Sequence, residues 1–174
     1  LASRRADSIA VTASSNLVGW VLAGAAAVVV GGEVTGADVW WGLLGGAGVA
    51  GGLVSLYAGY AKGRVSVAAP VAGVGAAALP VITEWAIGDD ELSRLGTAGV
   101  VLGLGAIGLV SIGRSDQSGT VGASLLYGLG GAVGIGLLLL CLARTSDDSG
   151  LWPIVAARGS GFVVLAAIMA TTGA

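Results

Sequence analysis

The sequence predicts an all-α membrane protein whose chain crosses the bilayer six times. Three observations lead to this fold class. The 174 residues are 55% hydrophobic and only 10% charged, with a mean hydropathy of +0.93, whereas soluble domains carry about 25% charged residues. The apolar residues are gathered in runs long enough to cross a hydrocarbon core of ~30 Å. Short polar connectors, which carry most of the charge, separate these runs.

The apolar runs follow one another along the whole chain. Each is close to the ~20 residues that a spanning helix needs, whereas a spanning β-strand needs only about 10 and alternates polar with apolar residues. The runs cover roughly residues 9–30, 39–60, 66–87, 95–112, 119–143 and 151–174. Among the 33 glycines, four pairs have the GxxxG spacing of close helix packing: Gly42/Gly46, Gly48/Gly52, Gly99/Gly103 and Gly130/Gly134. At this glycine content the pairs predict close packing in general and no particular interface.

The connector charges bear on orientation. Six spans place the connectors alternately on two sides of the membrane. One side collects Arg4, Arg5, Lys62, Arg64 and Arg114, and the other has only Arg94 and Arg144 among the connector acids. The positive-inside rule assigns the first side to the cytoplasm.

Composition also excludes several classes of function. A net charge of -2 with eight scattered basic residues predicts no nucleic-acid partner. The chain has no histidine, which excludes histidine-based metal sites and Ser-His-Asp triads, and its one cysteine, Cys141, cannot form a disulfide within the chain. No phosphate-binding loop of the form GxxxxGK[ST] is present. We therefore expect no cofactor, no metal and no enzymatic activity.

A weak internal repeat suggests how the helices are organised. A shift of 141 residues aligns L-A-S-R-R-A-D-S (1–8) with L-A-R-T-S-D-D-S (142–149), and each copy precedes an apolar run. The shift spans five runs, an odd number, so two copies would lie in opposite orientations. Inverted repeats of this kind are typical of secondary transporters.

In its order of segments the chain resembles the EamA-type branch of the drug/metabolite transporter superfamily. Three pieces carry the resemblance: S-V-A-A-P-V-A-G-V-G-A-A-A-L-P-V-I followed by G-D-D-E-L-S, then G-T-A-G-V-V-L-G-L-G-A-I-G-L-V-S, then S-G-L-W-P-I-V-A-A-R-G-S-G. The resemblance implies a ten-helix carrier built from two inverted five-helix halves (5+5). Residues 1–112 would be an N-terminal half without its first helix, 113–118 the linker, and 119–174 the first two helices of the C-terminal half. We accordingly expect a fragment. The usual family model places both termini in the cytoplasm, which is opposite to the charge count, so the orientation stays open.

An ionisable group within a span suggests a function, because it is costly there. Arg158 lies about two turns into the sixth run, after Trp152, and its guanidinium is suited to a substrate carboxylate. The alternative is an arginine that reaches to the membrane interface or pairs internally. Glu84 follows Pro80 by one turn and is a hypothetical proton-coupling carboxylate or an interfacial residue.

The remaining candidates lie in four of the runs. Pro70 and Pro80 each free a backbone carbonyl, which makes the third run either a cavity wall or a packing kink. A polar patch in the first run has two interpretations: it lines the substrate path, or it forms hydrogen bonds between helices. Aromatic residues near run ends fit an interfacial belt, and two deeper ones are candidate substrate contacts. The patch is Ser14, Ser15 and Asn16, and the two deeper aromatic residues are Tyr57 and Tyr127.

These features together predict a secondary transporter that moves a small metabolite or drug-like solute across the inner (plasma) membrane by alternating access. The alternative is a non-transporting multi-pass scaffold or subunit, since small-residue packing alone gives a similar composition. The expected partners are the lipid bilayer and a small-molecule substrate, with the chain acting as a monomer or a homodimer. Substrate, direction and energy coupling are not encoded in any motif.

Overall fold

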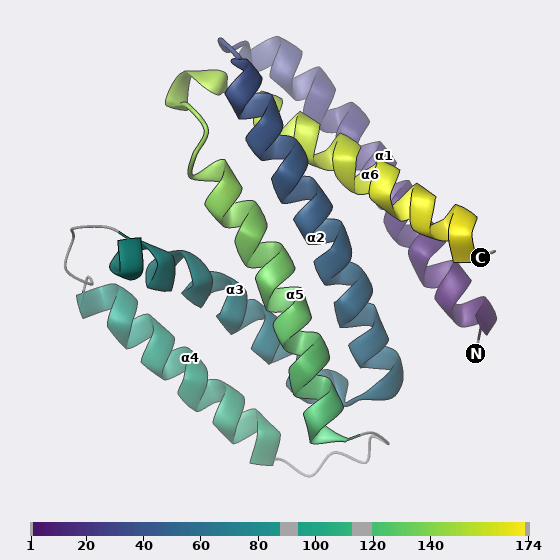
Figure 1. Ribbon diagram of the computed structural model, residues 1–174, viewed down its shortest axis with the longest axis vertical. Helices are drawn as coiled ribbons and strands as arrows, with labels where there is room; N and C mark the ends of the chain where they lie inside the picture. The colour runs from purple at the N-terminus through teal and green to yellow at the C-terminus, as the bar shows by residue number, and fades with distance from the viewer. Residues whose placement is uncertain (1, 88–93, 113–119, 173–174) are drawn as a thin grey trace. The chain divides into compact units, whose positions relative to one another are not determined.

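The computed structural model describes residues 2–87, 94–112 and 120–172. Side chains in parts of these ranges, among them residues 2–13, Asn16 and Glu84, lie outside the description. Six long α-helices make up most of the described residues, together with one short 3₁₀ helix, η1 (Figure 1). The α-helices are α1 (Ala2–Val30), α2 (Gly36–Lys62), α3 (Val65–Ile87), α4 (Arg94–Ile112), α5 (Val121–Leu142) and α6 (Trp152–Thr172), and η1 is Asp147–Ser149.

The helices agree closely with the apolar runs of the sequence. Within the described residues, four segments are long and apolar enough to cross a membrane, and Leu17–Val30 in α1 is a shorter apolar segment. The four are Gly36–Lys62, Val65–Thr83, Val121–Leu142 and Trp152–Thr171. The chain is thus a helical protein with the features of a multi-pass membrane protein. The six-span count and the 5+5 repeat stay predictions.

The chain divides into two compact units. The first contains residues 1–50 and 140–174, and the second contains residues 51–139. The predicted linker, 113–118, falls outside the described residues, so the division of the chain into 1–112 and 119–174 stays a prediction.

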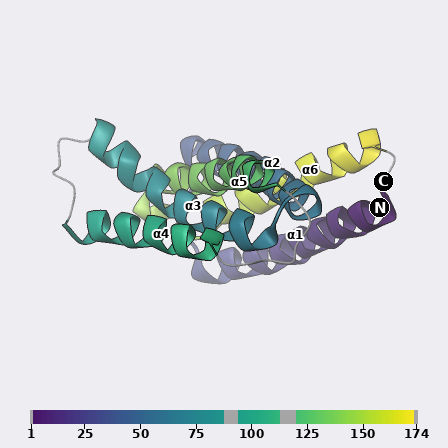
Figure 2. The ribbon, with the colours of Figure 1, turned by 90° about the horizontal axis from the view of Figure 1, so that it is seen from below.

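In the first unit, α6 packs between α1 and the first half of α2. It runs antiparallel to α1, and the chain ends of the two helices lie at the same end of the pair (Figures 1 and 2). It runs parallel to α2, because Gly42 faces Pro153 and Gly46 faces Ala157 one turn later. A β-carbon at Gly46 would overlap the Ala157 carbonyl oxygen and would lie 2.6 Å from its carbonyl carbon. Backbone contact this close requires glycine, and it permits weak Cα–H···O bonds.

In the second unit, α5 packs closely against two helices, α2 and α3, and glycines lie at both contacts. Toward α2, a β-carbon at Gly52 would lie 2.9 Å from the Gly134 Cα. Toward α3, a β-carbon at Gly128 would lie 2.9 Å from the Ala68 carbonyl oxygen. The core at this point contains Leu56, Ala68 and Ala72, with Tyr60 packed against it. The helix α4 packs against α3 (Figure 2), where Gly103 contacts Val74.

Candidate functional site

Arg158 and Trp20 cross between α1 and α6 in opposite directions. The guanidinium of Arg158, on α6, lies against Gly19 of α1, and the indole nitrogen of Trp20, on α1, lies 3.2 Å from the position of a β-carbon at Gly159 of α6. Each large side chain therefore occupies the space that a glycine leaves on the opposite helix. Gly19 and Trp20 are consecutive on α1, and Arg158 and Gly159 are consecutive on α6. Because consecutive residues lie about 100° apart around a helix, the two contacts lie on opposite sides of the line along which α1 and α6 touch.

The guanidinium of Arg158 lies flat against α1. The position of a β-carbon at Gly19 is 3.3 Å from Nη1, 3.4 Å from Cζ and 3.6 Å from Nε. Three nearly equal distances indicate that the face of the group, and not its edge, rests on the glycine. Because all guanidinium N–H bonds lie in the plane of the group, they point along the surface of α1 and away from its backbone. The side chain is exposed, and no carboxylate among the described residues pairs with it.

The position of Arg158 along α6 gives its exposure a chemical meaning. At ~1.5 Å per residue, its Cα lies about 9 Å along α6 from Trp152. The helix is one of the four that are long and apolar enough to span. Insertion scales give roughly 2.5–3.5 kcal/mol for an arginine at the centre of a spanning helix, and Arg158 lies between the start of α6 and its centre. The guanidinium can therefore bind an anion, or the arginine side chain can extend to the membrane interface, which are the two alternatives that the sequence predicted.

The capping of α2 helps to position α6. Thr35 and Asp38 form a capping box. The Thr35 N–H donates to Asp38 Oδ2 at 2.8 Å, the Thr35 hydroxyl donates to the same oxygen at 2.7 Å, and the Asp38 N–H donates to Thr35 Oγ1 at 3.3 Å. The sequence predicted a second run that begins near residue 39, and the capping box explains why α2 starts earlier, at Gly36.

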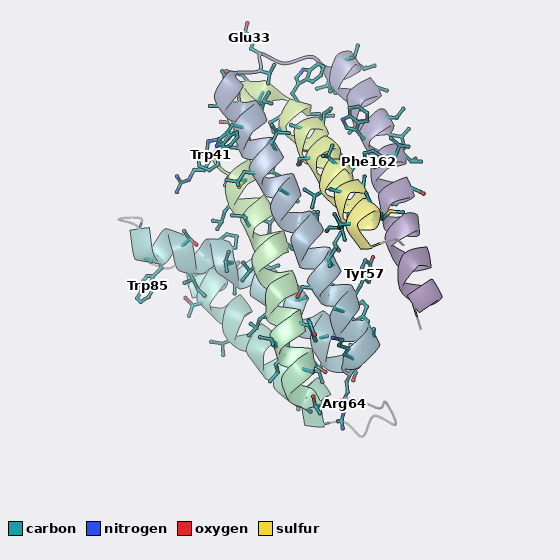
Figure 3. All side chains as sticks on the ribbon, turned by 45° about the vertical axis from the view of Figure 1, so that its right-hand side comes forward. Glu33, Trp41, Tyr57, Arg64, Trp85 and Phe162 are labelled. Atoms are coloured by element: carbon teal, nitrogen blue, oxygen red, sulfur yellow. The ribbon has the colours of Figure 1, made fainter. Side chains whose placement is uncertain are left out.

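Asp38 also holds the connector that leads into α6. The Ser146 N–H donates to Asp38 Oδ1 at 2.8 Å, and the Ser146 hydroxyl donates to Oδ2 at 3.1 Å. The Asp38 side chain is thereby buried, with 2% exposure. The Glu33 N–H adds a bond to the Asp148 carbonyl at 2.9 Å, and Figure 3 shows Glu33 at the turn between α1 and α2. We call this set of contacts the Asp38 clip.

Two glycines allow the connectors of the Asp38 clip to approach so closely. Gly32 has φ of +135°, and a β-carbon there would lie 2.9 Å from the Asp148 carbonyl oxygen. Gly150 has φ of +58°, and its β-carbon would overlap the Gly31 carbonyl oxygen. L-residues with side chains rarely adopt such conformations. The clip therefore fixes the start of α6 relative to the end of α1, which sets the register in which Arg158 meets Gly19.

The other predicted site residues of the first unit lie on the same two helices, α1 and α6. Trp152 is the half-buried first residue of α6, and the buried Pro153 follows it in the first turn, where proline is favoured. Ser14 and Ser15 are exposed on α1, and Ser15 lies one turn before Gly19 on the same side of the helix. The side chain of Asn16 lies outside the described residues.

The two predicted tyrosines belong to the second unit, where both are half-buried. Tyr57 packs edge-to-face with Tyr60, with ring centroids 6.0 Å apart. Tyr127 lies under the Lys62 ammonium, 5.8 Å from its ring centroid, and its carbonyl accepts the Ser55 hydroxyl at 3.2 Å. Figure 3 marks Tyr57 on α2. These contacts give both rings a packing role, and substrate contact stays a prediction.

Pro70 and Pro80 are half-buried within an α3 that continues through both. Pro80 lacks the N–H that would bond the Ala76 carbonyl. This carbonyl faces Gly136 of α5, where a β-carbon would lie 3.3 Å away. A glycine is thus packed against the freed group, while the cavity-wall role stays a prediction. The side chain of Glu84 lies outside the described residues.

The sequence did not single out Gly19, Trp20, Gly159 or the Asp38 clip. One signal was available for the clip, since T-x-x-D before an apolar run is close to the capping-box pattern. Trp20 was also unusual, because it lies within its run and away from the interfacial ends. Among the described residues, no group of three or more Cys, Asp or Glu is arranged to hold a metal ion.

A comparison of the chain with protein-family models, curated proteins and solved structures gives no match. Inference about function therefore rests on the helices and the Arg158 contact. The resemblance to EamA-type transporters stays a prediction.

Proposed function

We propose that this chain acts in the plasma membrane as a secondary carrier, or as part of one, and moves a small metabolite by alternating access. The observation that carries the proposal is Arg158. Its guanidinium lies two turns into an apolar helix of spanning length, without an acidic partner among the described residues. A charge in such a place is expensive, and by default it indicates a solute or ion pathway.

Tight helix packing supports a membrane architecture without separating a carrier from a scaffold. Glycine-to-backbone contacts occur in both units, as at Gly46 and Gly52, and a scaffold needs them equally. Arg158 favours the carrier, because packing against Gly19 accounts for a large side chain at this position but not for its charge. An EamA-type arrangement, with gradient-driven transport, is the form of carrier that the sequence favours.

Transport in proteoliposomes tests the carrier proposal. The full chain is reconstituted, and uptake and efflux of a panel of radiolabelled metabolites are measured with and without a proton gradient. We expect wild-type protein to move at least one solute and Arg158→Ala to lose that transport by tenfold or more, with unchanged yield and melting temperature. Arg144→Ala is the matched control, since Arg144 is an exposed arginine of the connector before α6 and should transport normally.

Two results would contradict the proposal at different levels. Wild-type rates in the Arg158→Ala variant would remove Arg158 from the solute pathway. A wild-type protein that is folded but moves no solute of the panel in either direction would favour the scaffold.

A further inference from the structure

Among the described side chains of the helices around it, Arg158 has no acidic acceptor. Neither α6 nor the segment Ser14–Val30 of α1 contains an aspartate or a glutamate. The acid in the first turn of α2, Asp38, is engaged in the Asp38 clip. The described side chains of these helices therefore leave the guanidinium open to an acceptor from a bound molecule.

The orientation of the guanidinium restricts what that acceptor is. Its face rests on Gly19, with Nη1, Cζ and Nε all 3.3–3.6 Å from the β-carbon position. Its donor edge is therefore directed along the surface of α1, and the fork presents two parallel N–H bonds in one plane. Two oxygens side by side, as in a carboxylate or a phosphate, match this fork. A single carbonyl or hydroxyl satisfies only part of it.

We propose that Arg158 forms a binding site for an oxyanion that presents two adjacent oxygens, with the flat surface of Gly19 holding the guanidinium in its binding orientation. The oxyanion comes either from a carboxylate-bearing solute or from the phosphate of a lipid headgroup. That such a solute is also transported rests on the proposed carrier function. The binding itself does not.

Calorimetric titration of the full chain in lipid-free dodecyl maltoside micelles tests the site. Benzoate is the probe, and benzamide, which has nearly the same shape without the charge, is the matched ligand control. We expect benzoate to bind, benzamide to show no binding, and Arg158→Gln to weaken benzoate binding about tenfold or more. Arg158→Lys should recover only part of the affinity, because lysine keeps the charge without the fork. Arg144→Gln should bind as wild type.

Native mass spectrometry of protein purified from membranes distinguishes the two sources of the oxyanion. A phospholipid that remains bound to wild type and is lost in Arg158→Gln, without benzoate binding, assigns the site to a lipid phosphate. Benzoate binding without such a lipid assigns it to a solute carboxylate. If Arg158→Gln changes neither benzoate binding nor lipid retention, the proposal is wrong.

The same proteins separate this inference from the carrier proposal. Arg158-dependent benzoate binding without transport of any solute supports the oxyanion site and contradicts the carrier. Transport that is indifferent both to benzoate and to Arg158→Gln supports the carrier and contradicts the oxyanion site.

Discussion

The two compact units use the same packing and differ in the polar groups that they place between helices. In the first unit, α1 and α6 meet through an arginine and a tryptophan, and a carboxylate ties their connectors. In the second, hydroxyls bond backbone groups, such as Ser124 with the Arg64 N–H at 2.6 Å, and the Lys62 ammonium lies over the Tyr127 ring. Glycine packing is common to both units and is typical of helices that pack within membranes. The Arg158 contact is peculiar to the first unit and indicates where function is to be sought.

Glycine substitutions test whether packing is equally tight in both units and should give the largest effects. Gly46→Ala should lower stability by about 1–3 kcal/mol, because its β-carbon meets the backbone of Ala157, which cannot move aside alone. Gly52→Ala should cost less, since its nearest contact is the Gly134 Cα at 2.9 Å. Melting temperature and membrane yield are the measurements.

Gly51→Ala is the control for both variants. It is on the same helix, is exposed, and has nothing within 4 Å of the β-carbon position, so its melting temperature should equal or exceed that of wild type. A loss at Gly51 as large as at Gly46 would show that α2 requires glycine for its backbone and not for its contacts.

Removal of single polar groups should give an equal or smaller effect and should sharpen the contrast between the units. Asp38→Ala deprives Ser146 and Thr35 of a buried acceptor and should cost about 1–3 kcal/mol. Ser124→Ala removes one neutral hydroxyl and should cost about 1 kcal/mol. Thermal melts and protease cleavage in the 143–151 connector measure the two effects, and cleavage should rise only in Asp38→Ala.

Asp147→Ala serves as the control for the Asp38 clip, because Asp147 is an exposed acid of the same connector. Equal destabilisation by Asp38→Ala and Asp147→Ala would mean that connector charge matters and the clip does not.

Gly19→Ala should have the smallest effect on stability and a selective effect on binding. Its β-carbon would lie 3.3 Å from Arg158 Nη1, at the free end of a flexible side chain, so the guanidinium can shift at a cost within about 0.5 kcal/mol. The shift tilts the donor edge, and benzoate affinity should fall several-fold. Gly24→Ala, on the same helix with nothing within 4 Å, should leave both quantities unchanged. If the two variants bind benzoate equally, Gly19 does not orient Arg158.

Apolar runs predicted the helices well, because run length and composition decide where a chain can cross a bilayer. The second run predicted α2 to within a few residues. The error at its start came from Asp38, which looks like a turn residue and proves to be the capping partner of Thr35. Its role depends on Ser146, which is 108 residues away in the sequence.

The sequence by itself determined the helical, membrane-like class, the positions of the connectors and the place of Arg158 within an apolar run, since each depends only on local composition and spacing. Tertiary structure decided which glycines form contacts. Gly46 and Gly51 look alike in the sequence, and only the neighbouring helix distinguishes them. Tertiary structure also placed Gly19 under Arg158, because the register of α6 on α1 is set by contacts between connectors that are more than a hundred residues apart.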